Sequence, residues 1–444
     1  MAETIKVGMV SLGCPKNQVD AEIMLAKLKD KGYEITPYEQ EAQVIIVNTC
    51  GFIESAKQES IDTILDLSGL KKEGNLKCLI VTGCLAERYR EQLKEQIPEI
   101  DTVVSIGRND EIADIIEQSL SGKTGECFGE KERLPLCGGR VLINEPYYAY
   151  IKIAEGCNNR CTYCAIPSIR GGLRSRTVES VVEEANTLAE NGVKELIVVA
   201  QDTTRYGEDI YGKCRLAELL NELCKIEKIH WIRLLYAYPD RLTDDIISVI
   251  KNQPKIVKYI DLPIQHCCGD VLKRMNRPGD RESLEKTIEK LRKEIPGITV
   301  RTTLIAGFPG ESEQQFCELS EFVKQMKFER LGCFAYSAEE GTPAAEFDDQ
   351  IPEEEKLRRA EIIMEQQSFI SDKLSEQKIG TITEVLVEGY DTYIKHFYGR
   401  TPADAPDIDC KIFFKSKRKP CAGDFVKVKI TDTMDMDLMG VETD

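Results

Sequence analysis

The sequence contains no long apolar segment. No run approaches the roughly 18–20 apolar residues that a membrane-spanning helix needs. The start, Met-Ala-Glu-Thr-Ile-Lys-Val, leads directly into a strand-like run and lacks the apolar core of a signal peptide. We therefore predict a cytoplasmic protein with no membrane partner.

Histidine and positive charge are also scarce. Only three histidines are present, so a mechanism built on histidine as acid and base is not expected. The 59 basic residues are outnumbered by 76 acidic ones, and the formal net charge is −17. Non-specific binding to phosphate backbones requires lysine and arginine to replace counterions. A basic protein partner therefore suits the overall charge better than nucleic acid does.

Cysteine, in contrast, is abundant, with 17 residues in a chain of 444. This length accommodates two or three domains, and 42% apolar and 30% charged residues are typical of a globular protein. Disulfides are rare in reducing compartments. We therefore expect the cysteines to include metal ligands.

The clearest motif is a C-x-x-x-C-x-x-C arrangement formed by Cys157, Cys161 and Cys164. Thiolates select iron–sulfur clusters, zinc or cuprous ions. A structural zinc site needs four ligands, and the next cysteine is Cys214. Three thiolates on a 4Fe–4S cluster would leave one iron open to a substrate. The alternatives are a zinc knuckle with a distant fourth ligand and three unrelated thiols.

This spacing, with the aromatic Tyr163 before the last cysteine, resembles the radical S-adenosylmethionine (SAM) superfamily. The resemblance implies that the open iron of a cluster at these cysteines binds the amino and carboxylate groups of SAM. It also places Tyr163 among the residues that contact this cofactor.

Residues 1–142 alternate strand and helix signals, which predicts an α/β domain with a parallel sheet. Cys14, Cys50 and Cys84 lie at the junctions between predicted strands and the helices that follow them. Ligands of such sheets collect outside the carboxyl ends of the strands, so the three thiols can converge at one edge; three buried cysteines placed there by chance are the alternative. Strands are predicted at 5–12, 44–47, 78–82 and 102–106, and helices at 20–31, 54–67, 87–95 and 110–120.

Residues 143–375 repeat this alternation about six times. Parallel strands joined by helices along a right-handed path can close partly into a barrel, with active groups at the carboxyl ends of the strands. We therefore expect a partial (β/α) barrel, as the radical SAM resemblance also implies. Strands are predicted at 147–154, 195–200, 231–236, 259–262, 300–305 and 331–336.

Several predicted strand ends of this barrel carry polar side chains. Gln201, Asp202 and Arg301 are candidates for binding SAM. His266 is a candidate for the substrate, as is Arg174, because a guanidinium fork suits a carboxylate. An ordinary turn or capping role is the alternative for each residue.

Two further groups of residues stand near these positions. Arg170 and Arg176 flank Arg174 in a glycine-rich segment, which predicts a basic patch; an exposed loop without a role is the alternative. Cys267 and Cys268 follow His266. We interpret this vicinal pair as core packing, and its redox behaviour stays open.

Residues 376–444 change character, because short strand-like runs with glycine and proline turns replace the helices. Five short strands predict a small antiparallel β-barrel, reached through a helix at 353–377. The four recognisable strands lie at 381–387, 390–398, 411–414 and 425–430, and an acidic tail at 432–444 follows. Position and pattern resemble the TRAM domain.

Over essentially its whole length the chain resembles the methylthiotransferase family. Ser-Leu-Gly-Cys-Pro-Lys-Asn and Asn-Thr-Cys-Gly-Phe resemble the branch that modifies an aspartate of small-subunit ribosomal protein S twelve. The tRNA-modifying branch typically has Gly-Cys-Gln-Met-Asn at the first motif. A tRNA methylthiotransferase acting on a modified adenosine is one alternative. A non-catalytic metal-binding scaffold for ribosome assembly is the other.

The resemblance implies an activity and its cofactors. Cys14, Cys50 and Cys84 would hold a second 4Fe–4S cluster beside the one that binds SAM. The reaction would replace a C–H bond of the aspartate β-carbon by C–SCH₃ and use two SAM molecules per turnover. A low-potential electron donor such as flavodoxin or ferredoxin is implied as a partner.

Overall fold

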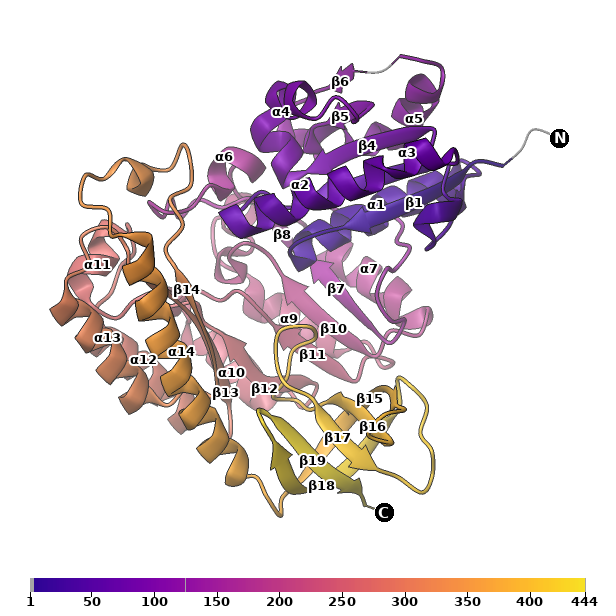
Figure 1. The fold of residues 1–444 in the computed structure, drawn as a ribbon. Helices are drawn as coiled ribbons and strands as arrows, with labels where there is room; N and C mark the ends of the chain where they lie inside the picture. The colour runs from indigo at the N-terminus through magenta and orange to yellow at the C-terminus, as the bar shows by residue number, and fades with distance from the viewer. Residues whose placement is uncertain (1–3, 124, 444) are drawn as a thin grey trace.

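The structure is a computed structural model that describes residues 4–123 and 125–443. Three units follow one another along the chain (Figure 1). An N-terminal parallel sheet lies above a central open sheet, and a small yellow barrel lies below it. None of the described helices combines the length and the apolar character that a membrane crossing requires.

The N-terminal unit is a six-stranded sheet in the order β2-β1-β3-β4-β5-β6, and all of its pairs are parallel. Helices α1 and α5 cover one face, and α2 and α4 cover the other, as the alternating apolar residues of the buried strands require. The short edge strand β6 was not predicted, because its Gly-Glu-Cys sequence carries no apolar alternation. The elements are β1 (Lys6–Ser11), α1 (Pro15–Asp30), β2 (Glu34–Ile35), β3 (Val44–Thr49), α2 (Glu54–Ser68), α3 (Leu70–Glu73), β4 (Cys78–Gly83), α4 (Cys84–Gln96), β5 (Thr102–Val104), α5 (Ile112–Leu120) and β6 (Gly125–Cys127).

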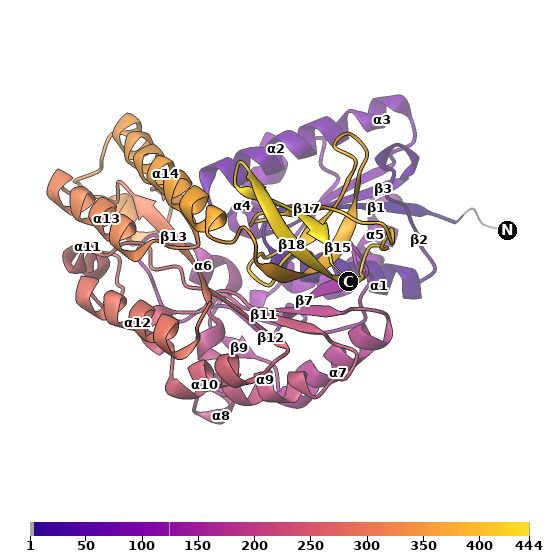
Figure 2. The same ribbon diagram turned by 90° about the horizontal axis from the view of Figure 1, so that it is seen from below.

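The central unit is an open, all-parallel sheet in the order β14-β13-β12-β11-β10-β7, which confirms the predicted partial barrel. Figure 2 shows its helices in an arc along one side of the sheet. Its main elements are β7 (Tyr148–Lys152), α7 (Val178–Glu190), β10 (Glu195–Val199), α9 (Leu216–Cys224), β11 (Trp231–Leu234), α10 (Asp244–Asn252), β12 (Ile256–Asp261), α12 (Arg281–Glu294), β13 (Thr299–Ala306), α13 (Glu313–Met326), β14 (Arg330–Ala335) and α14 (Glu353–Glu376). Shorter pieces are β8 (Ala154–Glu155), α6 (Ile166–Arg170), β9 (Arg174–Ser175), α8 (Glu208–Tyr211) and α11 (Gly269–Arg274).

The two faces of the central sheet have different neighbours. Apolar residues on one face pack against the helices in a single large core. Residues on the opposite face pack against α1 of the N-terminal unit and against the C-terminal barrel. Side chains that alternate along a strand point to opposite faces, so each strand serves both layers. The cysteine-bearing edge of the N-terminal sheet is thereby held over the central sheet.

The C-terminal unit is a closed barrel in the order β15-β16-β17-β19-β18. It differs from the prediction in three details. The expected strand 390–398 covers the end of β15, the hairpin turn at 392–395 and the start of β16, and the acidic tail supplies the fifth strand, β19. The β17–β19 pair is parallel, because a closed ring with an odd number of strands cannot alternate direction throughout. The strands are β15 (Ile382–Asp391), β16 (His396–Arg400), β17 (Ile412–Lys415), β18 (Phe425–Met434) and β19 (Asp437–Glu442).

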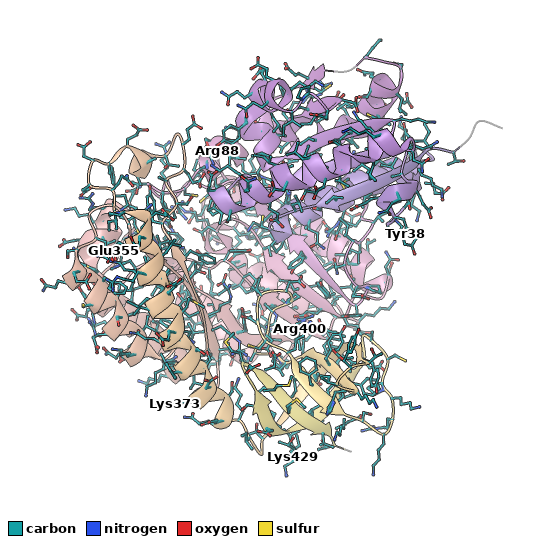
Figure 3. All side chains as sticks on the ribbon, viewed as in Figure 1. Tyr38, Arg88, Glu355, Lys373, Arg400 and Lys429 are labelled. Carbon is teal, nitrogen blue, oxygen red and sulfur yellow. The ribbon has the colours of Figure 1, made fainter. Side chains whose placement is uncertain are left out.

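Buried ion pairs join the barrel to the central sheet. Arg400 of β16 lies 2.7 Å from Glu195 of β10, which also accepts a hydrogen bond from Arg233 at 2.9 Å. Both arginines lower the pKa of Glu195 against the opposing effect of its burial. Arg330 of β14 reaches Asp404 at 2.5 Å. The position of Arg400 between the two units is visible in Figure 3.

Candidate active site

The first cysteine triad lies at the carboxyl ends of β1, β3 and β4. Cys14 precedes α1, Cys50 follows β3, and Cys84 opens α4. Two glycines permit their close approach: a Cβ on Gly13, whose φ is +86°, would lie 2.8 Å from Cys50 Sγ, and one on Gly51 would lie 3.0 Å from the carbonyl carbon of Cys84. The structure thus brings these three sequence-predicted residues together.

The second triad occupies the loop between β8 and α6. The backbone N–H of Asn159 donates to Cys157 Sγ at 3.5 Å, and Cys161 Sγ lies 3.4 Å from the hydroxyl of Tyr238. Burial raises the pKa of the Cys157 thiol to about 11 and that of Cys164 to about 12. Iron ligation requires thiolates. A positively charged metal centre would therefore offset the free-energy cost of ionising these buried thiols.

The donor sets suit clusters better than a single ion. No three His, Cys, Asp or Glu side chains within residues 4–123 and 125–443 converge closely enough to hold one metal ion. A mononuclear site needs its ligands at one point. In a 4Fe–4S cluster each thiolate binds a different iron, so three cysteines spread around a common space fit that group.

Helix α6 connects the surroundings of the two triads at the interface between the first two units. Helix α6 begins two residues after Cys164, and its Ile169 packs with Cys84 and Ala165 in a small apolar cluster. At the end of the same helix, Arg170 Nη2 donates to Cys84 Sγ at 3.3 Å. The helix that follows the second triad therefore forms a wall of the first.

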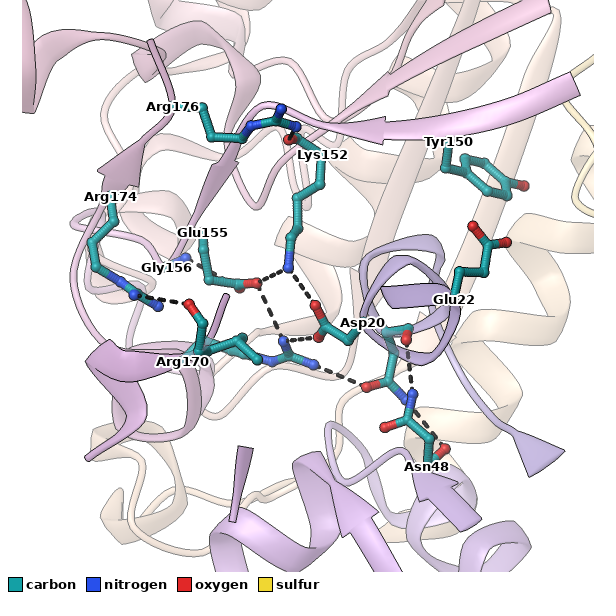
Figure 4. Close-up of polar contacts among 12 residues, drawn as sticks. Asp20, Glu22, Asn48, Tyr150, Lys152, Glu155, Gly156, Arg170, Arg174 and Arg176 are labelled. Carbon is teal, nitrogen blue, oxygen red and sulfur yellow. Dashed lines mark hydrogen bonds and ion pairs between the residues drawn. The ribbon is translucent and has the colours of Figure 1, made fainter. Parts of the chain in front are cut away.

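A buried ionic network locks this interface (Figure 4). Arg170 lies 2.5 Å from Asp20 and 3.2 Å from Glu155, and Lys152 binds the same two carboxylates. All four side chains are at most 2% exposed. The two positive and two negative charges balance. Burial alone would raise the pKa of Glu155, but Lys152 and Arg170 lower it to about 2.

The predicted basic patch is therefore wrong. Arg170 belongs to the buried network, and Arg176 is also buried, paired with Glu184 at 2.6 Å. Arg174 donates to backbone carbonyls of residues 131–134 in the segment between the first two units. Its guanidinium is engaged by these backbone carbonyls and does not present a free face to a substrate carboxylate. Local sequence cannot reveal such partners, because they lie in distant segments.

The candidates for SAM binding divide into two groups. Asp202 accepts from Asn159 Nδ2 at 2.7 Å, and Tyr163 Oη lies 3.4 Å from Arg277, so both border the second triad. Gln201 donates to Glu155, while its buried Oε1 has no hydrogen-bond partner among the described residues. Arg301 instead pairs with Asp261 at 2.9 Å and with Asp409 at 3.6 Å.

His266 is fully buried beside β12. Its Nδ1 accepts from the backbone N–H of Cys268 at 3.0 Å. Its Nε2 lies 3.6 Å from the carboxylate of Glu311. Cys267 and Cys268 pack in the main core. The histidine orders its own turn, and its side chain is fully buried.

A loop after β14 ties both triads to the edge of the central sheet. Arg88, four residues after Cys84, donates to buried Glu339 at 2.6 Å and to the carbonyl of Glu340 at 2.7 Å (Figure 3). Farther along, the N–H of Ala344 donates to the carbonyl of Thr162 at 2.9 Å. The 337–344 loop therefore contacts the surroundings of both cysteine groups.

Four site residues were missed by sequence reasoning. Lys16 Nζ lies 3.5 Å from the ring centroid of Tyr236, and Arg277 lies 4.0 Å from that of Tyr238. Tyr236 has a φ of +58°, a conformation that bulky residues rarely adopt. The available signals were the position of Lys16 two residues after Cys14 and the two tyrosines at the carboxyl end of the strand predicted at 231–236.

Three family descriptions match the chain in order. Residues 6–105 match the uncharacterized protein family UPF0004, residues 151–323 the radical SAM superfamily, and residues 379–442 the TRAM domain.

Curated relatives match nearly the whole length. A protein of Clostridium botulinum (strain Langeland) is 51% identical over 440 residues, covering 99% of this chain and 98% of its own. One of Caldanaerobacter subterraneus is 52% identical over 435 residues, covering 98% and 99%. Both are named ribosomal protein uS12 methylthiotransferase RimO.

Among solved structures, the radical SAM methyltransferase TsrM from Kitasatospora setae, with cobalamin and a [4Fe-4S] cluster bound, aligns with a TM-score of 0.57. The alignment covers 86% of this chain and 81% of that one, at 13% identity. This likeness supports the arrangement of the fold alone.

Proposed function

Because the chain belongs to the family of ribosomal protein uS12 methylthiotransferases named RimO, we propose that it adds a methylthio group to the β-carbon of an aspartate in uS12. The tRNA-modifying alternative is not favoured by these relatives. The observation that carries the proposal is the pair of cysteine triads, whose surroundings are joined by helix α6 at one interface. Family membership links that geometry to a named substrate.

The residues fit the implied cofactors. Cys157, Cys161 and Cys164 would hold a 4Fe–4S cluster with SAM, and the first triad would hold a second cluster. Bound there, these groups supply the one-electron chemistry, the methyl group and the sulfur that replacement of an unactivated hydrogen needs. Two SAM molecules per turnover and a low-potential electron donor such as flavodoxin or ferredoxin belong to this proposal.

The chain's own residues bind SAM and orient the loop of the second triad. Asp202 holds Asn159 and thereby the loop of the second triad. The unpartnered Oε1 of Gln201 offers an acceptor to a donor group of SAM. Arg301 acts through Asp261, whose carboxylate also accepts from the backbone N–H of Tyr236 at 3.0 Å. The α6 wall keeps water away from Cys84.

Organisation and location are also part of the proposal. We place the domain boundaries at 142/143, before β7, and at 375/376, one residue before the end of α14. A ribosomal protein as substrate, free or on the ribosome, implies a cytoplasmic location.

The decisive experiment is mass spectrometry of uS12 from cells with the gene, without it, and with Cys161→Ala. We expect one aspartate peptide to gain a CH₂S unit, about 46 Da, only when the intact gene is present. Cys317→Ala, which changes an exposed cysteine of α13, is the matched control and should retain the modification. Unmodified uS12 in cells that express the intact protein would refute the proposal.

A further inference from the structure

Glu339 is a buried carboxylate in the loop that connects β14 to α14. This loop rises from the central sheet toward the N-terminal unit (Figure 1), and the Glu339 side chain is only 2% exposed. Three donors surround the carboxylate: Arg88 Nη1 at 2.6 Å, Ser337 Oγ at 2.6 Å and Lys57 Nζ at 3.3 Å. Burial alone would raise the pKa of Glu339, but the hydrogen bonds from Ser337 and Arg88 lower it. The carboxylate is therefore ionised at neutral pH and binds two cations of another unit.

Lys57 connects Glu339 to the helix that holds Cys50. It lies on α2, three residues before Ser60. The hydroxyl of Ser60 accepts a hydrogen bond from the N–H of Cys50 at 3.1 Å and donates one to the Cys50 carbonyl at 2.9 Å. The same helix therefore fixes the backbone of a first-triad cysteine and contributes a cation to Glu339.

Arg88 connects Glu339 to the helix that carries Cys84. It lies on α4, which begins at Cys84. It also donates to the carbonyl of Gly51, the residue directly after Cys50, at 3.0 Å. Its guanidinium thus joins the backbone beside the first triad to the carboxylate of Glu339. Glu339 is thereby attached to the surroundings of two of the three first-triad cysteines.

The same loop continues to the second triad. Thr342 Oγ1 donates to the carbonyl of Glu339 at 2.6 Å, which closes a turn. Two residues later, the N–H of Ala344 donates to the carbonyl of Thr162 at 2.9 Å. Thr162 directly follows Cys161. One ordered turn of the loop therefore connects Glu339 to the backbone of the second triad.

This connection is separate from the one made by α6. That helix ends at Arg170, which contacts Cys84 from the segment that follows the second triad. Glu339, in contrast, is carried by the loop after the edge strand β14. Two bodies joined at a single place can rotate about it, whereas two separate links fix their relative orientation. Glu339 therefore supplies the second link between the surroundings of the two triads.

We propose that Glu339 is a positioning residue that fixes the second triad relative to the first and thereby couples SAM cleavage to methylthio transfer. This inference rests on the proposed function, in which the chemistry of both triads must reach the same aspartate carbon. A misplacement of about 1 Å in such an arrangement can lower a rate about 100-fold. Loss of the Glu339 link should therefore leave SAM cleavage intact, while less of the cleaved SAM leads to product.

The test compares cluster-loaded wild-type enzyme with Glu339→Gln on purified uS12. The amide keeps the shape of the side chain, removes its charge and replaces one acceptor by a donor. We expect the amount of 5′-deoxyadenosine formed per methylthiolated uS12 to rise about 10-fold or more. Pulsed EPR on the enzyme without uS12 should show a broader distribution of distances between the two reduced clusters. Glu346→Gln, which removes an exposed carboxylate from the same loop, should match wild type in both measurements.

The ratio separates positioning from a purely structural role. An unchanged ratio in Glu339→Gln overturns the assignment, and so does a variant in which iron content, SAM cleavage and product fall together. If Glu339→Gln does not retain its iron, Lys57→Met is used in the same comparison, because it removes one of the two cations that bind the carboxylate. Wild-type enzyme that cleaves SAM but leaves uS12 unmodified refutes the proposed function. The EPR comparison then still tests Glu339, and an unchanged distance distribution overturns its positioning role.

Discussion

Removal of Arg170 should separate the first two units before either unfolds. Its guanidinium pairs with Asp20 at 2.5 Å and Glu155 at 3.2 Å and also donates to Asn17 at 3.0 Å. In Arg170→Met, Lys152 alone must compensate two buried carboxylates. Loss of one partner from a buried ion pair costs about 3–5 kcal/mol, and we expect a loss of this size at the interface.

Hydrogen exchange resolves this effect by region. Exchange should be measured on cluster-free, reduced protein, so that a change in cluster loading beside Cys84 does not add to the effect. We expect faster exchange in α1 and α6, while the interior strands of both sheets stay protected. Lys286→Met provides the control, because Lys286 and Glu282 form an exposed pair on α12 whose loss should leave the exchange rates unchanged.

A compensating variant tests whether the uncompensated buried charge is what weakens the interface. Arg170→Met with Asp20→Asn restores a balance of one positive and one negative charge, so the double variant should recover about 1–3 kcal/mol of coupling. The electrostatic argument fails if Arg170→Met exchanges like Lys286→Met. It also fails if the double variant loses the sum of the two single effects.

Three further predictions concern other parts of the molecule. Gly13→Ala should lower the iron content per chain, because its Cβ would lie 2.8 Å from Cys50 Sγ, whereas Gly32→Ala, with a similar φ of +89° and no atom within 4 Å, should load normally. The lowered pKa of Glu195 stabilises the fold at neutral pH; this contribution should fade as pH falls below the ordinary 4.5, so the Tm of Glu195→Gln should depend less on acid than that of wild type. Arg88→Ala should free the 337–344 loop, and limited proteolysis should then cut there first, with uncut loop in the variant refuting its anchoring role.

Local patterns predict the elements and both triads. Buried parallel strands and their helices are each encoded within 5 to 20 residues of sequence, so α13 (Glu313–Met326) and the cysteine positions could be located. Cys14, Cys50 and Cys84 converge because parallel strands share one edge, a rule that needs no side-chain detail.

Contacts between distant segments could not be predicted in this way. Arg170 looked like an exposed loop residue, since its partner Asp20 lies 150 residues earlier in the chain. The Lys16–Tyr236 contact joins two units, and the hydrophobic periodicity of the sequence does not predict it. Strand β19 was missed because it lies in an acidic stretch of sequence and only Leu438 and Gly440 of its six residues are buried in the barrel. The contacts and burial of such residues depend on segments that are distant in the sequence, and the local sequence encodes neither.

The contact between Arg170 and Cys84, which are 86 residues apart, has a consequence for biogenesis. The N-terminal unit emerges first from the translating ribosome and folds as a unit, but at that stage its third cysteine lacks the α6 wall. Iron delivered so early would enter a site still open to water and oxygen. Maturation of this centre is therefore expected to follow translation of residue 170, which makes docking of the two units a checkpoint for cofactor insertion.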